Sequence, residues 1–220
     1  MEQLKVSVDF EFLVGHGFEA TEVPRLASKL SAEPRARAAA MALRVVVQQL
    51  GWKRLGDRIV ETAAPVSGPW RPVRDEYGGA EITRFWREIR EGAQIGAMML
   101  PTLSWAGFHL SVGEKCIIGH HFLRFSAFSK DLEGLRRPLM ECSRAVAECV
   151  GSAQVVYGPD SASRFELVWD LVADGADVGS VLLKLEECCG EPCASFDELE
   201  MRRVEWPRTG AEPYLVERLG

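Results

Sequence analysis

The stretch KLEECCGEPC, from Lys184 to Cys193, places three cysteines within six residues of this sequence. Such a group could bind a metal ion, carry out redox chemistry or belong to the fold. A structural zinc site needs two well-spaced ligand pairs, and the spacing of Cys188, Cys189 and Cys193 does not supply them. Cys188 and Cys189 instead continue an apolar stripe at helical spacing, as buried cysteines do. We therefore expect no metal and no cofactor, and we expect Cys193, in a loop, to be the most reactive thiol.

Two adjacent histidines, His120 and His121, are the next residues that could ligate a metal or transfer a proton. They fall in a predicted strand, where successive side chains point to opposite faces, so a single ion cannot easily take both. We expect one of them to be buried and the other exposed. His16, in the turn sequence GHG, has no partner that the sequence reveals.

Sequence motifs for nucleophilic catalysis and phosphate binding are missing from the chain. Pro159 and Asp160 match the start of nuclease sites that pair an aspartate with a later acidic-x-Lys. The expected partner is missing, because Leu182 and not an acid stands two positions before Lys184. No catalytic residue is predicted on these grounds.

Acidic residues are concentrated in the C-terminal third. The whole chain has a net charge of −6. Asp160 to Glu205 contains twelve acidic and four basic residues, a net of −8, whereas Glu22 to Arg90 has thirteen basic and eight acidic ones, a net of +5. The acidic block is either an ordinary solvated surface or a docking face for a basic partner, and it argues against direct binding of nucleic acid. The candidate partner-binding residues are Glu186, Glu187, Glu191, Asp197, Glu198 and Glu200.

The apolar pattern predicts a mixture of strands and helices. Leu4 to Val14 alternates, which indicates a half-buried strand with Phe10 and Phe12 facing the core and Glu11 facing away. Helices are predicted over Pro34–Leu50, Glu81–Ala93, Leu132–Val150 (with Pro138 kinking or restarting it) and Val178–Cys189, and capping boxes at Ser163–Glu166 and Ser195–Glu198 begin two further elements. Further strands are predicted at Phe108–Val112, at Cys116–Phe128 with Gly119 as a possible bulge, at AQVVYG and around Arg203–Trp206.

This order lacks regular strand–helix alternation and any internal repeat. We predict a single α+β domain over residues 1–220, with a mixed, mostly antiparallel sheet packed against several helices. Gly92–Gly113 is long enough to span a membrane and carries no charge, but Pro101 and several glycines favour a helix end followed by a buried strand. The first ten residues lack the features of a signal peptide, and the cysteines fit a reduced, cytoplasmic protein.

In its layout the chain resembles the immunity proteins of bacterial toxin systems, and most closely the immunity-protein-52 type found beside nuclease toxins of type VI secretion. The alternating first strand, the segment LSWAGFHLSV and the acidic third that begins at VYGPDS carry this resemblance. It implies a cytoplasmic, non-enzymatic inhibitor that binds one cognate toxin and blocks its active site. Two other classes stay open: a small thiol- or metal-dependent hydrolase that uses Cys193 and a histidine, and a structural subunit of a larger assembly.

Overall fold

The computed structural model describes residues 9–50, 70–73, 77–92, 100–105, 107–160 and 166–220. Within these ranges, the strands form one antiparallel sheet in the order β2-β3-β4-β5-β1-β6-β7. The strands are β1 (Asp9–Gly15), β2 (Arg71–Pro72), β3 (Thr102–Trp105), β4 (Phe108–Val112), β5 (Cys116–Arg124), β6 (Gln154–Asp160) and β7 (Leu215–Arg218). The helices are η1 (Ala20–Glu22), α1 (Val23–Ala32), α2 (Pro34–Leu50), α3 (Gly79–Arg90), α4 (Phe125–Ser129), η4 (Leu132–Gly134), α5 (Arg136–Val150), α6 (Glu166–Ala173), α7 (Val178–Cys189) and α8 (Phe196–Thr209).

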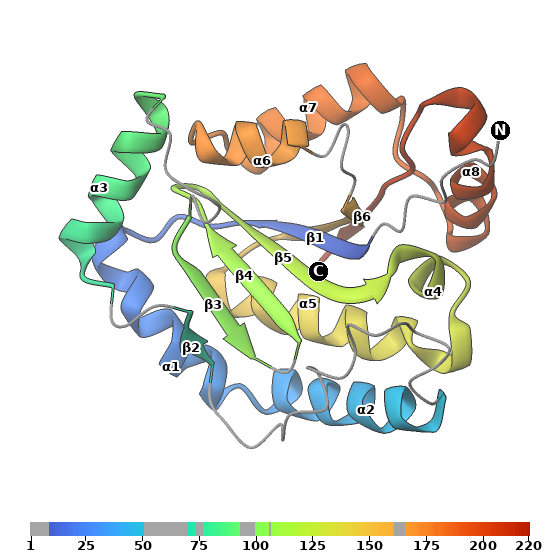
Figure 1. Cartoon of the computed structure of the whole chain (residues 1–220), viewed down its shortest axis with the longest axis horizontal. Helices are drawn as coiled ribbons and strands as arrows, with labels where there is room; N and C mark the ends of the chain where they lie inside the picture. Colours follow the sequence, from blue (N-terminus) through green and yellow to red (C-terminus); the bar gives the residue numbers. More distant parts are fainter. Residues whose placement is uncertain (1–8, 51–69, 74–76, 93–99, 106, 161–165) are drawn as a thin grey trace, which may run out of the picture.

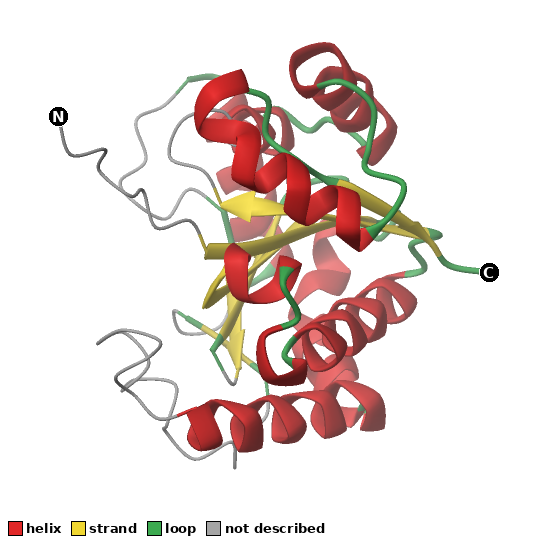
Figure 2. Ribbon diagram, turned by 90° about the vertical axis from the view of Figure 1, so that its right-hand side faces the viewer, coloured by secondary structure: helices red, strands yellow, loops and turns green. Residues whose placement is uncertain are grey.

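Helices cover both faces of this sheet, as the α+β prediction requires. Figure 1 and Figure 2 show α6 and α7 on one face, with α5 and α2 beneath the other. The short helix α4 and the last helix, α8, lie together at one end of the sheet. The protein is therefore an α+β fold in which the sheet is the middle layer.

The central strand, β1, is buried on both faces, which the sequence did not predict. Phe10 and Phe12 are buried as expected, at 0% and 1% exposed. Glu11 is also only 1% exposed, so the prediction of a half-buried strand with Glu11 facing solvent was wrong. The second face of β1 is also covered, because α7 contacts β1 and its Val178 approaches Gly15. Leu4, Val6 and Val8 lie outside the described residues.

Gly119 makes room for an aromatic ring and does not form a bulge. It pairs regularly with Phe12 on one side and with Leu110 on the other, so the bulge prediction was wrong. A Cβ atom added to Gly119 would overlap the ring of Phe12. The ladder between β1 and β5 is instead irregular between Asp9 and Phe10.

The helical stripes read from the sequence were largely confirmed. The bounds of α2 and α7 are as predicted, and α3 covers most of Glu81–Ala93. In the Leu132–Val150 segment, a short 3-10 turn precedes α5, and Pro138 lies in the first turn of α5, where a missing N–H costs no hydrogen bond. The buried face of α5 contains the predicted residues Leu139, Cys142, Val146 and Cys149.

Several elements differ from the prediction. The segment Phe125–Ser129 is helical, so β5 ends four residues before the predicted end at Phe128. The strand predicted around Arg203–Trp206 was wrong, since these residues belong to α8 and the last strand is β7. The helix α1 was not predicted, although its buried residues Val23, Leu26, Ala27 and Leu30 have helical spacing.

The segment Gly92–Gly113 contributes strands to the sheet. Thr102–Trp105 and Phe108–Val112 form the antiparallel pair β3–β4. Within the described ranges, no helix combines the length and the apolar character that crossing a bilayer requires. The part of this segment from 93 to 99 lies outside the described residues.

His16 anchors the loop after β1. Its Nε2 atom lies 2.9 Å from the carbonyl oxygen of Gly113, and its ring stacks on Phe18 with the centroids 3.6 Å apart. Burial lowers the pKa of His16 to about 4, and the hydrogen bond to Gly113 only partly opposes this shift. The histidine is therefore neutral in the folded protein over most of the pH range.

We predict that Gly119→Ala destabilises the protein by about 1–3 kcal/mol, because the new methyl group overpacks the Phe12 ring. In a Phe12→Leu background the same substitution should cost less, since the smaller side chain can yield. Urea unfolding of the four proteins measures this coupling. Gly17→Ala is the matched control, because an added Cβ there meets no atom within 4 Å. Equal costs in both backgrounds would contradict the steric explanation.

We predict that His16 destabilises the fold as the pH falls from about 6.5 to about 4. In this window the unfolded state binds a proton at His16 and the folded state does not. At pH 4.5 the difference is on the order of 2–3 kcal/mol relative to pH 7. His16→Gln should therefore be less destabilising at pH 4.5 than at pH 7, compared with wild type at each pH. A pH-independent difference in unfolding free energy between the two proteins would exclude this role.

Candidate functional site

The connection between α7 and α8 is held by hydrogen bonds to its backbone. Arg202, on α8, donates to the carbonyl oxygens of Glu191 and Cys189, at 2.6 and 2.9 Å. The Tyr214 hydroxyl donates to the carbonyl oxygen of Gly190 at 2.9 Å. The backbone N–H of Cys193 donates to the carbonyl oxygen of Tyr214 at 2.8 Å. These contacts fix the two helices relative to each other and thus fix the charges that they display.

Four of the six predicted partner-binding carboxylates are exposed. Glu187 makes a 2.7 Å ion pair with Lys184 on the same helix, where solvent screens the attraction. Glu191 lies in the connection between the helices, and Asp197 in the first turn of α8. The exposed set is Glu186, Glu187, Glu191 and Asp197.

The other two predicted residues, Glu198 and Glu200, have structural roles. The Glu198 carboxylate accepts a hydrogen bond from the backbone of Ala194 at 2.8 Å, and the Glu198 N–H donates to Ser195 at 3.2 Å. This arrangement confirms the capping motif at Ser195–Glu198, although the carboxylate caps Ala194 and not Ser195 itself.

Glu200 ties α8 to α4. It accepts hydrogen bonds from the Ser129 hydroxyl at 2.5 Å and from the Arg203 guanidinium at 2.6 Å, and it lies 3.8 Å from the Lys130 amine. Partial burial opposes its charge, but the hydrogen bonds from Arg203 and Ser129 outweigh it and lower the pKa of Glu200. Glu198 and Glu200 therefore stabilise the fold and are half-buried, which leaves them poorly placed to meet a partner.

Large apolar side chains accompany the exposed carboxylates. Leu183 is 71% exposed and precedes Glu186 and Glu187 by three and four residues, so all three share one side of α7. On α8, Met201 and Val204 are 54% and 60% exposed, and Met201 follows Asp197 by four residues. We define the acidic α7–α8 surface as Leu183, Glu186, Glu187, Glu191, Asp197, Met201, Val204 and Glu205.

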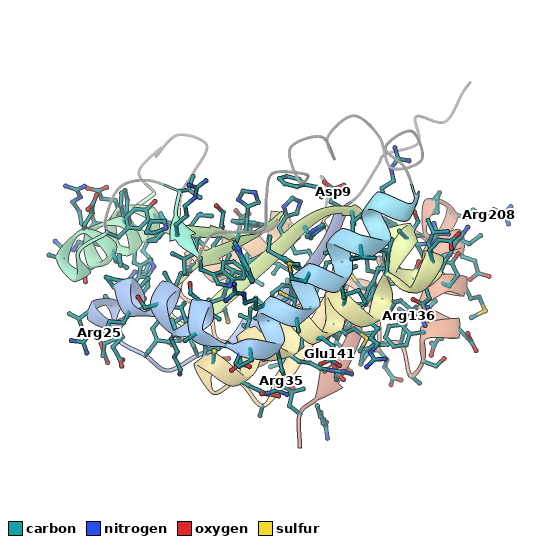
Figure 3. All side chains as sticks on the ribbon, turned by 90° about the horizontal axis from the view of Figure 1, so that it is seen from below. Asp9, Arg25, Arg35, Arg136, Glu141 and Arg208 are labelled. Atoms are coloured by element: carbon teal, nitrogen blue, oxygen red, sulfur yellow. The ribbon has the colours of Figure 1, made fainter. Side chains whose placement is uncertain are left out.

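Two arginines of the basic segment Glu22 to Arg90 lie on the opposite side of the sheet (Figure 3). Figure 3, seen from below, shows Arg25 on α1 and Arg35 on α2, both on the side away from α6 and α7. Arg35 forms ion pairs with Glu33 and Glu148, which offset part of its positive charge. These two arginines therefore lie away from α6 and α7, whereas α3, which belongs to the same basic segment, contacts α6.

The cysteines do not form a reactive site. None of the six cysteines forms a disulfide, and Cys193 is 5% exposed because its segment pairs with Leu215 beside β7. The prediction of an exposed, reactive Cys193 was therefore wrong. Burial raises the pKa of Cys193, and it raises the pKa of Cys116 and of Cys142 to about 12. A protonated, buried thiol is a poor nucleophile, so these cysteines do not support a thiol-dependent hydrolase.

The two neighbouring histidines face opposite sides of the sheet, as predicted. His121 is 2% exposed and packs edge-on against Phe108, with the ring centroids 4.5 Å apart. His120 is half-buried on the other face, where its Nε2 atom lies 3.5 Å from the Asp9 carboxylate. The described residues contain no group of three or more His, Cys, Asp or Glu side chains arranged to hold a metal ion.

The sheet brings His109 beside His120, which sequence reasoning missed. The two are directly paired between β4 and β5, and His109 is paired with Ser104 on β3. Burial, and then the charge of His120, lower the pKa of His109. In the hairpin formed by β4 and β5, the numbers of paired residues add to 229, so His109 lies opposite His120. The two strands predicted around the turn VGEK were the sequence signal for such a pairing. We call Asp9, His109, His120 and Phe122 the sheet-face histidine group.

We predict that Cys188, and not Cys193, reacts first with a thiol reagent in the native protein. Cys188 is half-exposed on α7, whereas Cys116, Cys142, Cys149, Cys189 and Cys193 are buried. Alkylation for short times, followed by mass spectrometry of the peptides, should find Cys188 modified before the others. Cys188→Ser should remove the fast phase and leave unfolding by urea unchanged. Faster modification of Cys193 would show that its segment opens readily.

No protein-family model matches this chain, and no match was found among the curated proteins or among the solved structures.

Proposed function

We propose that this protein binds a basic protein partner through the acidic α7–α8 surface and acts without catalysis. One observation supports the proposal above the others: the acidic α7–α8 surface combines five exposed carboxylates with three large exposed apolar side chains, on two helices joined by a hydrogen-bonded connection. Exposed apolar residues among charges are the usual composition of a docking surface, where the apolar groups contribute affinity and the charges contribute specificity and association rate.

The partner that fits this surface is positively charged. At least Glu186, Glu191 and Asp197 have no ion pair with a neighbouring basic side chain among the interactions of the described residues. Their field extends about 10 Å into a solution of 0.1 M salt and would attract a basic surface. Since Glu198 and Glu200 serve the fold, the binding set is smaller than the sequence suggested.

Within this class, we propose an immunity protein that neutralises a nuclease toxin of a type VI secretion system in the cytoplasm. A nuclease must attract phosphate groups, so the rim of its active site is basic. An inhibitor with an acidic surface can cover that rim and exclude the nucleic acid. The resemblance in layout to immunity proteins supports this choice of partner, and the buried thiols give no support to the hydrolase alternative.

We predict that charge reversal at Glu186 and Glu187 slows association with the partner about tenfold at low salt and has a smaller effect on dissociation. The test measures binding kinetics, at two salt concentrations, against the purified product of the gene adjacent to this one. Glu91→Lys with Glu148→Lys is the matched control, since both are exposed acids outside α7 and α8 and together change the net charge equally. Glu148 lies on α5, on the opposite face of the sheet from α7 (Figure 1). An association rate that responds equally to both double variants would reject a specific acidic docking surface.

We predict that Leu183→Ala and Met201→Ala have the opposite kinetic signature. Each removes an exposed apolar anchor, so dissociation should become roughly tenfold faster while association changes little. Their stability should match wild type, because neither side chain packs in the core. If the two variants dissociate like wild type, the partner binds elsewhere on the molecule.

A further inference from the structure

The sheet-face histidine group has a geometry that points to a ligand of its own. Asp9 lies on β1, His120 on the neighbouring strand β5, and His109 on the next strand, β4. All three are on the face of the sheet opposite to His121. Side chains of Asp9 and His120 are 12% and 20% exposed, so they are shielded from bulk water but not sealed from it.

The separation of Asp9 and His120 is that of two ligands on one metal ion. The Nε2 atom of His120 lies 3.5 Å from Oδ2 of Asp9. This distance exceeds that of an ordinary N–H···O hydrogen bond, about 2.7–3.2 Å. Two ligands at about 2.0–2.1 Å from a tetrahedral ion are about 3.4 Å apart. The pair therefore already has the edge length of a tetrahedral site.

His109 is placed to supply a third ligand after a small rotation. The imidazole centroids of His109 and His120 are 6.4 Å apart. Two imidazoles that share a tetrahedral ion have centroids roughly 5 Å apart, given metal–nitrogen distances of about 2.0–2.1 Å. His109 and His120 are directly paired across β4 and β5, so a turn of the His109 side chain is the movement that would bring the two imidazoles closer. Two side chains of the group thus have the separation of metal ligands, and the third would have to move to join them. As placed, the three do not form a completed set of ligands.

Phe122 limits how the two imidazoles can move. The Phe122 ring is edge-on to both imidazoles. Its centroid lies 5.2 Å from the centroid of His109 and 5.5 Å from that of His120, with interplanar angles of 71° and 90°. A ring held against both imidazoles restricts their rotamers and lowers the entropy lost when an ion binds. Glu11 is paired with His120 across the strands and lies beside the group.

We propose that Asp9, His109 and His120 form a binding site for a divalent transition metal, with Zn²⁺ as the best fit and water as the fourth ligand. Imidazole nitrogen with one carboxylate oxygen is a ligand set that Zn²⁺ accepts, and a water ligand leaves a position open to a further group. The site does not depend on the acidic α7–α8 surface, because it lies on strands β1, β4 and β5 and shares no residue with that surface.

The test is a calorimetric titration of the protein with Zn²⁺ alone. It uses the Cys188→Ser variant, which lacks the accessible thiol. We expect one Zn²⁺ per chain with a micromolar dissociation constant. His109→Gln and His120→Gln should each weaken binding at least tenfold, and Asp9→Asn should weaken it severalfold. Co²⁺ should give the visible absorption of a tetrahedral nitrogen and oxygen site, which the His120 variant should lose.

His16→Gln is the matched control, because it removes a histidine remote from the group and should leave Zn²⁺ affinity unchanged. Circular dichroism checks that each variant is folded, and if the His120 variant does not fold, Asp9→Asn and His109→Gln decide. Absence of Zn²⁺ binding to the Cys188→Ser protein would overturn the proposal. The proposal would also be overturned if the Cys188→Ser protein and the folded His109→Gln and Asp9→Asn variants bound Zn²⁺ with equal affinity.

Discussion

The burial of β1 on both faces is the constraint on which the rest of the structure depends. This strand is hydrogen-bonded to β5 on one side and to β6 on the other, and every residue from Phe10 to Val14 is buried. On one face, Phe10 packs against Phe128 and Tyr157, with ring centroids 4.6 and 6.1 Å apart. The other face must then be covered too, and α6 and α7 provide that cover. A glycine at position 119 follows from the same packing.

The chain's C-terminal part is attached to this core by polar contacts as well as by packing. Glu217, on β7, accepts hydrogen bonds from the Arg144 guanidinium of α5 and from the Tyr157 hydroxyl, the latter at 2.7 Å. A paired, partly buried carboxylate of this kind fixes the position of a strand. Since β7 passes beside Cys193, the same attachment also buries that thiol. The connection to α8 and the carboxylates that it displays are positioned through this chain of contacts.

The two proposed sites lie in regions with different physics. The acidic α7–α8 surface is exposed, screened by salt and suited to a large partner. The sheet-face histidine group is half-buried, where each charge or ligand interaction is worth more than in water. Helices create the first region from residues close in sequence, whereas the second needs three strands to meet.

The sequence by itself determined the features that depend on local spacing. Pro34–Leu50 and Val178–Cys189 are helices with the predicted bounds because an apolar stripe repeats at helical spacing and proline or glycine marks an end. Tertiary structure alone decided the burial of Glu11 and Cys193, since each depends on segments distant in the chain. It also decided that Glu200 stabilises the fold, because Ser129 and Lys130 reach it only in the folded protein. Local patterns specify elements, but the contacts between distant elements set the environment of each side chain.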